Sequence, residues 1–263
     1  MYGTAWKEDA TRELVRRALA AGFRAIDTAN QRKHYHEAAV GEALADAYAR
    51  GVVRREELFL QTKFTHRGGQ DNRLPYDASA SITKQVEQSF QSSLEHLRTN
   101  TLDAYVLHGP STRRGLANED LEAWRAMESL GVGALGVSNV TAEQLALLVE
   151  RASVRPVFVQ NRCYASAGWD REVRAVCSKH GIVYQGFSLL TANRRETSEP
   201  AFLSIAKRLS LTPAQLVFRF ALDVGVLPLT GTSSDAHMRE DLAVLERPPL
   251  SVADVSTIEN IAS

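Results

Sequence analysis

Short apolar runs alternate with amphipathic stretches along the whole chain. The stretches carry apolar residues at helical spacing, as at Leu14, Ala18 and Ala21. Because strand and helix alternate, the strands are expected to pair in parallel through helical crossovers. The eight runs that resemble strands are Tyr2–Ala5, Arg24–Thr28, Leu58–Phe64, Ala104–Leu107, Ala134–Val137, Val157–Gln160, Val183–Phe187 and Val226–Leu229.

Residues typical of helix N-caps and C-caps lie at the ends of the predicted helices. Thr141 and Gln144 form a capping-box pattern, in which each side chain satisfies a backbone amide. Thr212, Pro213 and Gln215 suit the cap, first and third positions of another helix. Glycines stand where a helix should hand over to a strand, at Gly22, Gly131, Gly181 and Gly225.

Eight such units around one core predict an α/β fold of the (β/α)8 TIM-barrel type, with residues 1–263 as a single domain. The length suits such a barrel but would also allow two domains. A doubly wound open sheet is the alternative architecture. No G-x-G-x-x-G pattern follows the first predicted strand, which counts against that alternative.

Charge and cysteine content narrow the class of protein. The 31 basic residues balance 31 acidic ones, so we expect a small-molecule substrate, and neither nucleic acid nor a membrane as partner. Cys163 and Cys177 lack the spacing of a zinc or redox site, which predicts a reducing compartment and no metal. Neither a signal peptide nor a run of about 18 apolar residues is present, which predicts a soluble cytoplasmic protein.

Polar residues follow the predicted strands closely. In a parallel barrel, the loops at the carboxyl ends of the strands build the site. Helix capping could explain each residue alone, but an acid, a lysine, a histidine and several amides on one face favour catalysis. These residues are Asp27, Lys63, His108, Ser138, Asn139, Gln160, Asn161, Ser188, Thr230, Gly231, Thr232, Ser233 and Ser234.

Lys63 ends an apolar run, so its ammonium should lie inside or at the rim of the barrel, where an unpaired charge is unfavourable. Asp27, at the end of the neighbouring strand, is the natural partner, and the two could form an inert salt bridge. A tyrosine close to Lys63 would favour catalysis instead. A positive charge lowers the pKa of a phenol from about 10, which suits it to proton transfer.

Each of the remaining candidates has either a structural or a functional interpretation. His108 could hydrogen-bond a substrate carbonyl, or its ring could be satisfied by neighbouring backbone. Phe187 could stack on a flat ring or belong to the core. A primary carboxamide, which has donors and acceptors to satisfy, could bind to Ser138, Asn139, Gln160 and Asn161.

Six motifs resemble, in this order, those of the aldo-keto reductase family. They are GTAWK at Gly3–Lys7, GFRAIDTA at Gly22–Ala29, EAAVG at Glu37–Gly41, LFLQTKF at Leu58–Phe64, DAYVLHGP with His108, and GVSN with Ser138 and Asn139. The likeness runs through nearly the whole chain. It implies a barrel that reduces an aldehyde or ketone by hydride transfer from a nicotinamide, more often NADPH than NADH.

The resemblance also implies roles for residues. Asp27, Lys63 and His108 match three of four catalytic positions, and the fourth is a tyrosine that acts as general acid. The implied substrate-binding residues are Trp6, His34, Tyr35 and His108. The implied contacts to the nicotinamide cofactor include Thr4, Trp6, Ser138, Asn139, Gln160, Asn161, Phe187 and Ser188.

The loop after Asp27 departs from the family pattern. The expected tyrosine slots hold Arg32 and His34, and the distance from Asp27 to Glu37 is longer than usual. Tyr35 is the nearest tyrosine and our candidate for the acid. His34 is its rival, because an imidazole transfers protons near neutral pH.

The phosphate end of the cofactor site departs from the pattern as well. The usual lysine is missing after Pro228, and the arginine slot holds His237, with Arg239 two residues later. The loop before the next helix still offers backbone amides and hydroxyls to an anion. NADPH therefore remains the expected cofactor, with this end bound by Thr230, Gly231, Thr232, Ser233, Ser234, His237, Arg239, Glu240 and Asp241.

Two other functions stay open. One is a nicotinamide-binding regulatory barrel with vestigial turnover, which the displaced tyrosine would explain. The other is an aldolase-like enzyme with Lys63 as Schiff-base nucleophile, although such an enzyme has no need for an amide-binding set. A monomer or weak homo-oligomer is expected. Both ends of the sequence are short for the family, so an open substrate pocket is expected.

Overall fold

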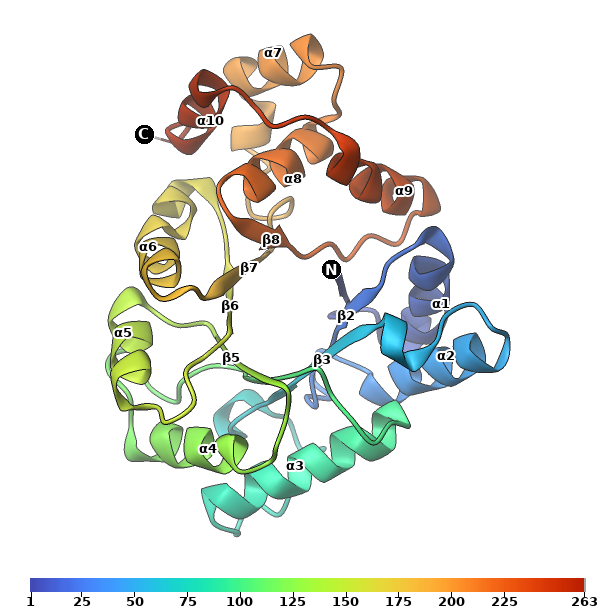
Figure 1. The fold of residues 1–263 in the computed structure, drawn as a ribbon, viewed down its shortest axis with the longest axis vertical. Coiled ribbons are helices and arrows are strands. Elements are labelled where there is room, and N and C mark those ends of the chain that lie inside the picture. The colour runs from blue at the N-terminus through green and yellow to red at the C-terminus, as the bar shows by residue number, and fades with distance from the viewer. Residues whose placement is uncertain (263) are drawn as a thin grey trace. The chain divides into compact units, whose positions relative to one another are not determined.

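A computed structural model describes residues 1–262. Eight parallel strands follow one another in chain order, and helices alternate with them (Figure 1). The strands are β1 (Tyr2–Gly3), β2 (Ala25–Asp27), β3 (Phe59–Phe64), β4 (Ala104–Leu107), β5 (Ala134–Ser138), β6 (Phe158–Arg162), β7 (Val183–Phe187) and β8 (Val226–Pro228). All eight predicted strands are confirmed, two of them with the predicted ends and the others with ends that shift by at most two residues.

Ten α-helices are found within residues 1–262. They are α1 (Thr11–Ala21), α2 (Glu37–Ala49), α3 (Ile82–Leu97), α4 (Asn118–Glu128), α5 (Ala142–Arg151), α6 (Arg171–His180), α7 (Pro200–Arg208), α8 (Pro213–Asp223), α9 (Asp235–Ala243) and α10 (Val252–Glu259). The predicted capping boxes open α5 and α8. Gly22 and Gly181 are left-handed at the ends of α1 and α6, as the sequence predicts.

The chain divides into two compact units, Met1–Val159 and a second that begins at Gln160. In the first unit, β1 to β5 pair in register, so that Asp27 lies beside Gln61 and Lys63 beside Val106. Neighbouring helices from α1 to α4 pack against one another.

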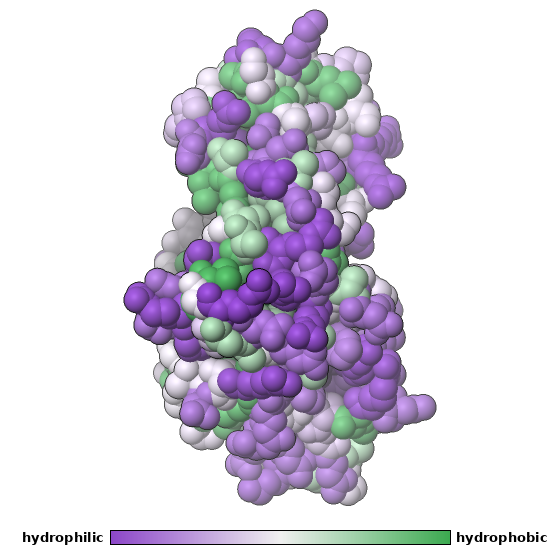
Figure 2. Space-filling model, turned by 90° about the vertical axis from the view of Figure 1, so that its right-hand side faces the viewer, coloured by the Kyte–Doolittle hydropathy of each residue, from purple (hydrophilic) through white to green (hydrophobic). Residues whose placement is uncertain are grey.

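On the face drawn in Figure 2, hydrophilic residues predominate and apolar groups are small and separate. The single-domain prediction stays a prediction.

Helices α2 and α3 approach each other closely at Gly41. A methyl group there would lie 1.9 Å from the carbonyl oxygen of His96 and 2.8 Å from the Cα of Leu97. Because both neighbours are backbone atoms, they cannot rotate away. The glycine of the EAAVG motif is thus required by helix packing.

Gly41→Ala should therefore destabilise the protein by about 1–3 kcal/mol, the usual cost of overpacking. The measurement is urea denaturation. The matched control is Gly68→Ala, because a methyl at Gly68 meets no atom within 4 Å. Equal stability of the two variants would contradict the close approach of α2 and α3.

Trp169 is buried in the second unit. Its ring lies against Phe220 with 4.9 Å between centroids, and its indole N–H donates to the carbonyl oxygen of Ile258 at 3.0 Å. The chain is left-handed through Gly168, Trp169 and Asp170 before α6 begins. Strands β7 and β8 pair in parallel in this unit. No helix within residues 1–262 is long and apolar enough to cross a membrane.

Candidate active site

Three titratable side chains project from the carboxyl ends of neighbouring strands in the first unit. Asp27 is the last residue of β2, Lys63 lies near the end of β3, and His108 directly follows β4. Parallel pairing of these strands brings their carboxyl ends to one edge. Correct prediction of the strand ends was therefore enough to predict that these three residues lie together.

Lys63 and Asp27 form the expected pair. Lys63 Nζ donates to Asp27 Oδ1 at 2.6 Å and to the carbonyl oxygen of Thr28 at 2.8 Å. Both side chains are buried, and Lys63 is completely so. Burial lowers the pKa of Lys63, and the Asp27 carboxylate opposes that shift.

Gln61 completes the surroundings of Asp27. Its Nε2 donates to Asp27 Oδ1 at 2.7 Å, and its side chain is fully buried. We did not single out Gln61 from the sequence. The signal was there, because residues two apart in a strand share a face, and Gln61 is a polar residue two positions before Lys63.

Tyr35 lies against both Lys63 and His108. Lys63 Nζ is 5.2 Å from the centroid of the Tyr35 ring, and the Tyr35 and His108 ring centroids are 5.8 Å apart at an interplanar angle of 70°. The backbone N–H of Tyr35 donates to the carbonyl oxygen of Gln31 at 3.0 Å, which folds the loop back.

The pKa of the Tyr35 phenol is raised, first by burial and then by the Asp27 carboxylate. The expectation that Lys63 lowers this pKa is wrong. Two donors of Lys63 are directed to Asp27 and Thr28, and the adjacent carboxylate compensates the ammonium charge. The phenol therefore keeps its proton, as a proton donor must.

His34 points to a different partner. Its ring stacks on Trp6 with 3.9 Å between centroids, and the backbone N–H of Trp6 donates to the carbonyl oxygen of His34 at 2.7 Å. Trp6 remains 70% exposed. Of the two candidates for the acid, Tyr35 has its ring against Lys63 and His108.

His108 is held as a neutral ring. Burial, followed by the charges of Lys63 and His34, lowers the pKa of His108 to about 3. His108 Nδ1 lies 2.7 Å from Thr65 Oγ1. Thr65, like Gln61, is a residue of this site that we did not select from the sequence.

Asn139 orients the end of β5. Its Nδ2 donates to the carbonyl oxygen of His108 at 2.7 Å and to Ser138 Oγ at 3.0 Å. Asn139 is exposed and left-handed with φ of 54°, a conformation that asparagine tolerates. With its nitrogen engaged, Asn139 presents its amide oxygen as an acceptor.

Thr4 is also in the first unit, but it is fully buried. Its Oγ1 donates to the carbonyl oxygen of Asp27 at 2.9 Å, and its backbone N–H donates to the same oxygen at 3.0 Å. Thr4 therefore supports the strand end that carries Asp27.

The predicted amide residues of the second unit are buried and hydrogen-bonded. Gln160 Nε2 donates to Gln185 Oε1 at 2.9 Å, and Asn161 Nδ2 donates to Asp170 Oδ2 at 2.8 Å. Phe187, in contrast, is half-buried at the end of β7 and is followed by Ser188 with φ of 59°. Phe187 thus keeps a partly open surface.

The segment before α9 matches the predicted anion site in part. Ser234 caps α9 by accepting from the backbone N–H of His237 at 3.4 Å, and His237 and Arg239 are exposed. Thr230 Oγ1 donates to Asp241 Oδ2 at 2.6 Å. Asp241 therefore braces the loop, while the exposed Arg239 remains accessible to an anion.

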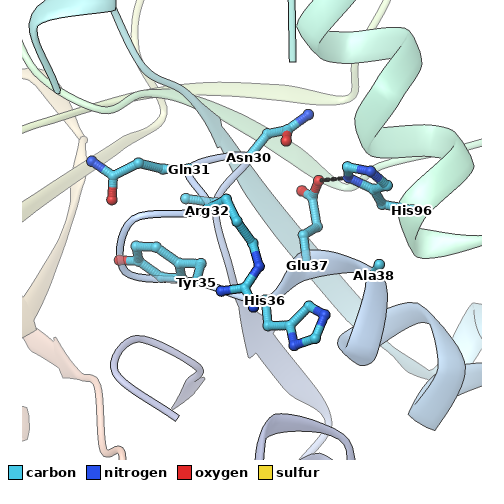
Figure 3. Close-up of a pocket in the computed structure, with 9 residues that line it drawn as sticks. Asn30, Gln31, Arg32, Tyr35, His36, Glu37, Ala38 and His96 are labelled. Carbon is cyan, nitrogen blue, oxygen red and sulfur yellow. Dashed lines mark hydrogen bonds and ion pairs between the residues drawn. The ribbon is translucent and has the colours of Figure 1, made fainter. Parts of the chain in front are cut away.

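A pocket of about 240 Å³ lies beside the loop that carries Tyr35 (Figure 3). Glu37 points across it to His96, with His96 Nδ1 3.0 Å from Glu37 Oε2. The other oxygen of Glu37 accepts from Thr62, the residue before Lys63. Arg32 and His36 also line the pocket.

The model of the Aldo/keto reductase family matches residues 2–263. This chain belongs to the aldo-keto reductase family. An aldo-keto reductase of Mycobacterium avium (strain 104) is 32% identical over 91% of this chain and 77% of its own length. Aldo-keto reductase AKR2E4 of Bombyx mori is 28% identical over 93% of this chain and 81% of its own length.

Solved structures agree with this assignment. The crystal structure of the Bombyx mori aldo-keto reductase in complex with NADP has a TM-score of 0.81 and 25% identity, over 99% of this chain and 87% of that one. The predicted (β/α)8 fold class is confirmed. As an aldo-keto reductase, the protein is an NAD(P)H-dependent oxidoreductase.

Proposed function

We propose that this aldo-keto reductase reduces an aldehyde or ketone to an alcohol with NADPH, or runs the reverse oxidation, and that Tyr35 is its general acid. The observation that supports the proposal is the position of the Tyr35 ring against both Lys63 and His108. Tyr35 is displaced from the family position, and its spatial partners are nevertheless the family's lysine and histidine.

Each of the two units contains side chains whose chemistry suits a nicotinamide cofactor. In the first unit, the exposed Asn139 offers an amide oxygen to a carboxamide N–H. In the second, the half-buried Phe187 offers an aromatic face, and α9 offers the exposed Arg239 and its first backbone amides to a phosphate. When bound, a reduced nicotinamide supplies the hydride.

Residues of the protein supply the proton for carbonyl reduction. Tyr35 donates its phenolic proton to the carbonyl oxygen, so that hydride and proton together give the alcohol. The neutral His108 orients the carbonyl by a hydrogen bond. The Lys63 ammonium lies 5.2 Å from the Tyr35 ring centroid and compensates the Asp27 carboxylate, whose charge alone would oppose loss of the phenolic proton. Asp27 holds Lys63 in place, and Gln61 in turn holds Asp27.

The test of this function mixes the protein with NADPH and a panel of aldehydes and ketones while nicotinamide absorbance is followed. Oxidation of NADPH that depends on the carbonyl supports reduction. A binding protein with vestigial turnover is the second candidate, because two Lys63 donors are directed to Asp27 and Thr28. Tight cofactor binding without turnover on any carbonyl or alcohol would favour it.

Arg239→Ala should weaken NADPH binding about tenfold, because a charge-assisted hydrogen bond to the 2′-phosphate is lost. NADH binding should change less than twofold, since NADH lacks that phosphate. Fluorescence titration with both cofactors measures this. Arg171→Ala, another arginine of the second unit that is paired with Glu259, is the control. Equal weakening for both cofactors would contradict a role for Arg239 at the phosphate.

A further inference from the structure

Thr65 is held so that its hydroxyl faces His108. The backbone N–H of His108 donates to the carbonyl oxygen of Phe64 at 2.8 Å, which places the two residues side by side. The carbonyl oxygen of Thr65 accepts from the Tyr76 hydroxyl at 2.8 Å. A methyl at Gly69 would lie 2.7 Å from Thr65 Cγ2, so the Thr65 methyl group fills that space.

The hydrogen bond between Thr65 Oγ1 and His108 Nδ1 can run in two directions. A neutral imidazole carries one ring proton, on Nδ1 or on Nε2. If Nδ1 carried it, the Thr65 hydroxyl would accept, and its own proton would need another acceptor. Thr65 is 5% exposed, and its hydroxyl contacts no second partner within residues 1–262.

The opposite direction satisfies both members of this hydrogen bond. When Thr65 donates to Nδ1, the ring proton lies on Nε2. The hydroxyl proton then has an acceptor, and the lone pair of Nδ1 has a donor. Burial and the charge of Lys63 keep the ring neutral, so the doubly protonated form does not compete. A neighbouring hydrogen bond selects the tautomer in the same way for many functional histidines.

We propose that Thr65 is a positioning residue that holds His108 in the Nε2–H tautomer. His108 then presents a donor, which is what a carbonyl oxygen requires, because that oxygen only accepts. The tautomer itself follows from the local hydrogen bonds. Its use in orienting a substrate carbonyl rests on the proposed function.

The primary test is the ring-nitrogen NMR spectrum of the ¹⁵N-histidine-labelled protein near neutral pH, with His108→Asn used to assign the His108 signals. The wild type should show His108 protonated on Nε2. In Thr65→Val, which keeps the branched shape and removes the hydroxyl, the two tautomers should mix. Thr65→Ser, which keeps the hydroxyl, should restore the wild-type spectrum. A wild-type ring protonated on Nδ1, or an unchanged ring in Thr65→Val, would overturn the proposal.

Activity is the second readout. Thr65→Val should lower kcat/KM for the carbonyl about tenfold, as expected for one lost hydrogen bond, while the Kd for NADPH stays unchanged. Thr65→Ser should remain within about twofold of the wild type. Full activity of Thr65→Val with a mixed tautomer would refute the positioning role. A wild type with the Nε2–H tautomer and no turnover would refute the proposed function and leave the tautomer standing.

Discussion

Tyr35→Phe is expected to lower kcat for carbonyl reduction by at least about a hundredfold, the usual contribution of a positioned general acid. The phenylalanine keeps the ring against Lys63 and His108, so the Kd for NADPH should stay unchanged. Steady-state kinetics and a cofactor titration on the same preparation measure both values. Because the pKa of the phenol is raised, the wild-type acid stays protonated at neutral pH.

Two further variants control for this result. Tyr164→Phe removes a hydroxyl from a half-buried tyrosine of the second unit and should leave kcat unchanged. His34→Gln should change KM more than kcat, because His34 stacks on the exposed Trp6. A Tyr35→Phe enzyme with full turnover, together with an inactive His34→Gln, would move the acid role to His34.

Lys63→Met is expected to abolish turnover and to reduce the free energy of unfolding by about 3–5 kcal/mol. The mutation leaves the Asp27 carboxylate buried without its charge partner. Adding Asp27→Asn removes that charge and should recover part of the stability but none of the activity. Urea denaturation of the single and double variants forms a double-mutant cycle.

The matched control is Lys84→Met, which removes an exposed lysine paired with Glu87. Its effect on stability should stay within about 0.5 kcal/mol, since exposed ion pairs contribute little. If Lys63→Met were as stable as Lys84→Met, Lys63 would not be the required charge partner of the buried Asp27.

The sequence predicted most of the fold because its signals are local. Apolar runs determine strands, and the caps at Thr141 and Thr212 lie within three residues of the amides they satisfy. The predicted strands gave the positions of their carboxyl ends, where Asp27, Lys63 and His108 lie. Parallel pairing alone carries these three residues to one edge.

The sequence could not reveal contacts that depend on cross-strand register or on loop conformation. Residue spacing places Gln61 on the same strand face as Lys63, but its contact with Asp27 depends on the register of β2 and β3. Thr65 contacts His108 because β3 and β4 pair with Phe64 beside Leu107. The family motif likewise did not say which residue of the enlarged loop faces Lys63. A turn that brings the Tyr35 N–H to Gln31 decides that, and it leaves His34 on Trp6.

By itself, the sequence determined the order of strands and helices, the fold class, the family and three polar strand ends. All of these rest on local patterns or on motifs read in order. The tertiary structure alone decided which ring lies beside Lys63, the direction of the pKa shift of Tyr35 and the partner of His108 Nδ1. These depend on burial and on distances between segments far apart in the chain, which local patterns do not encode.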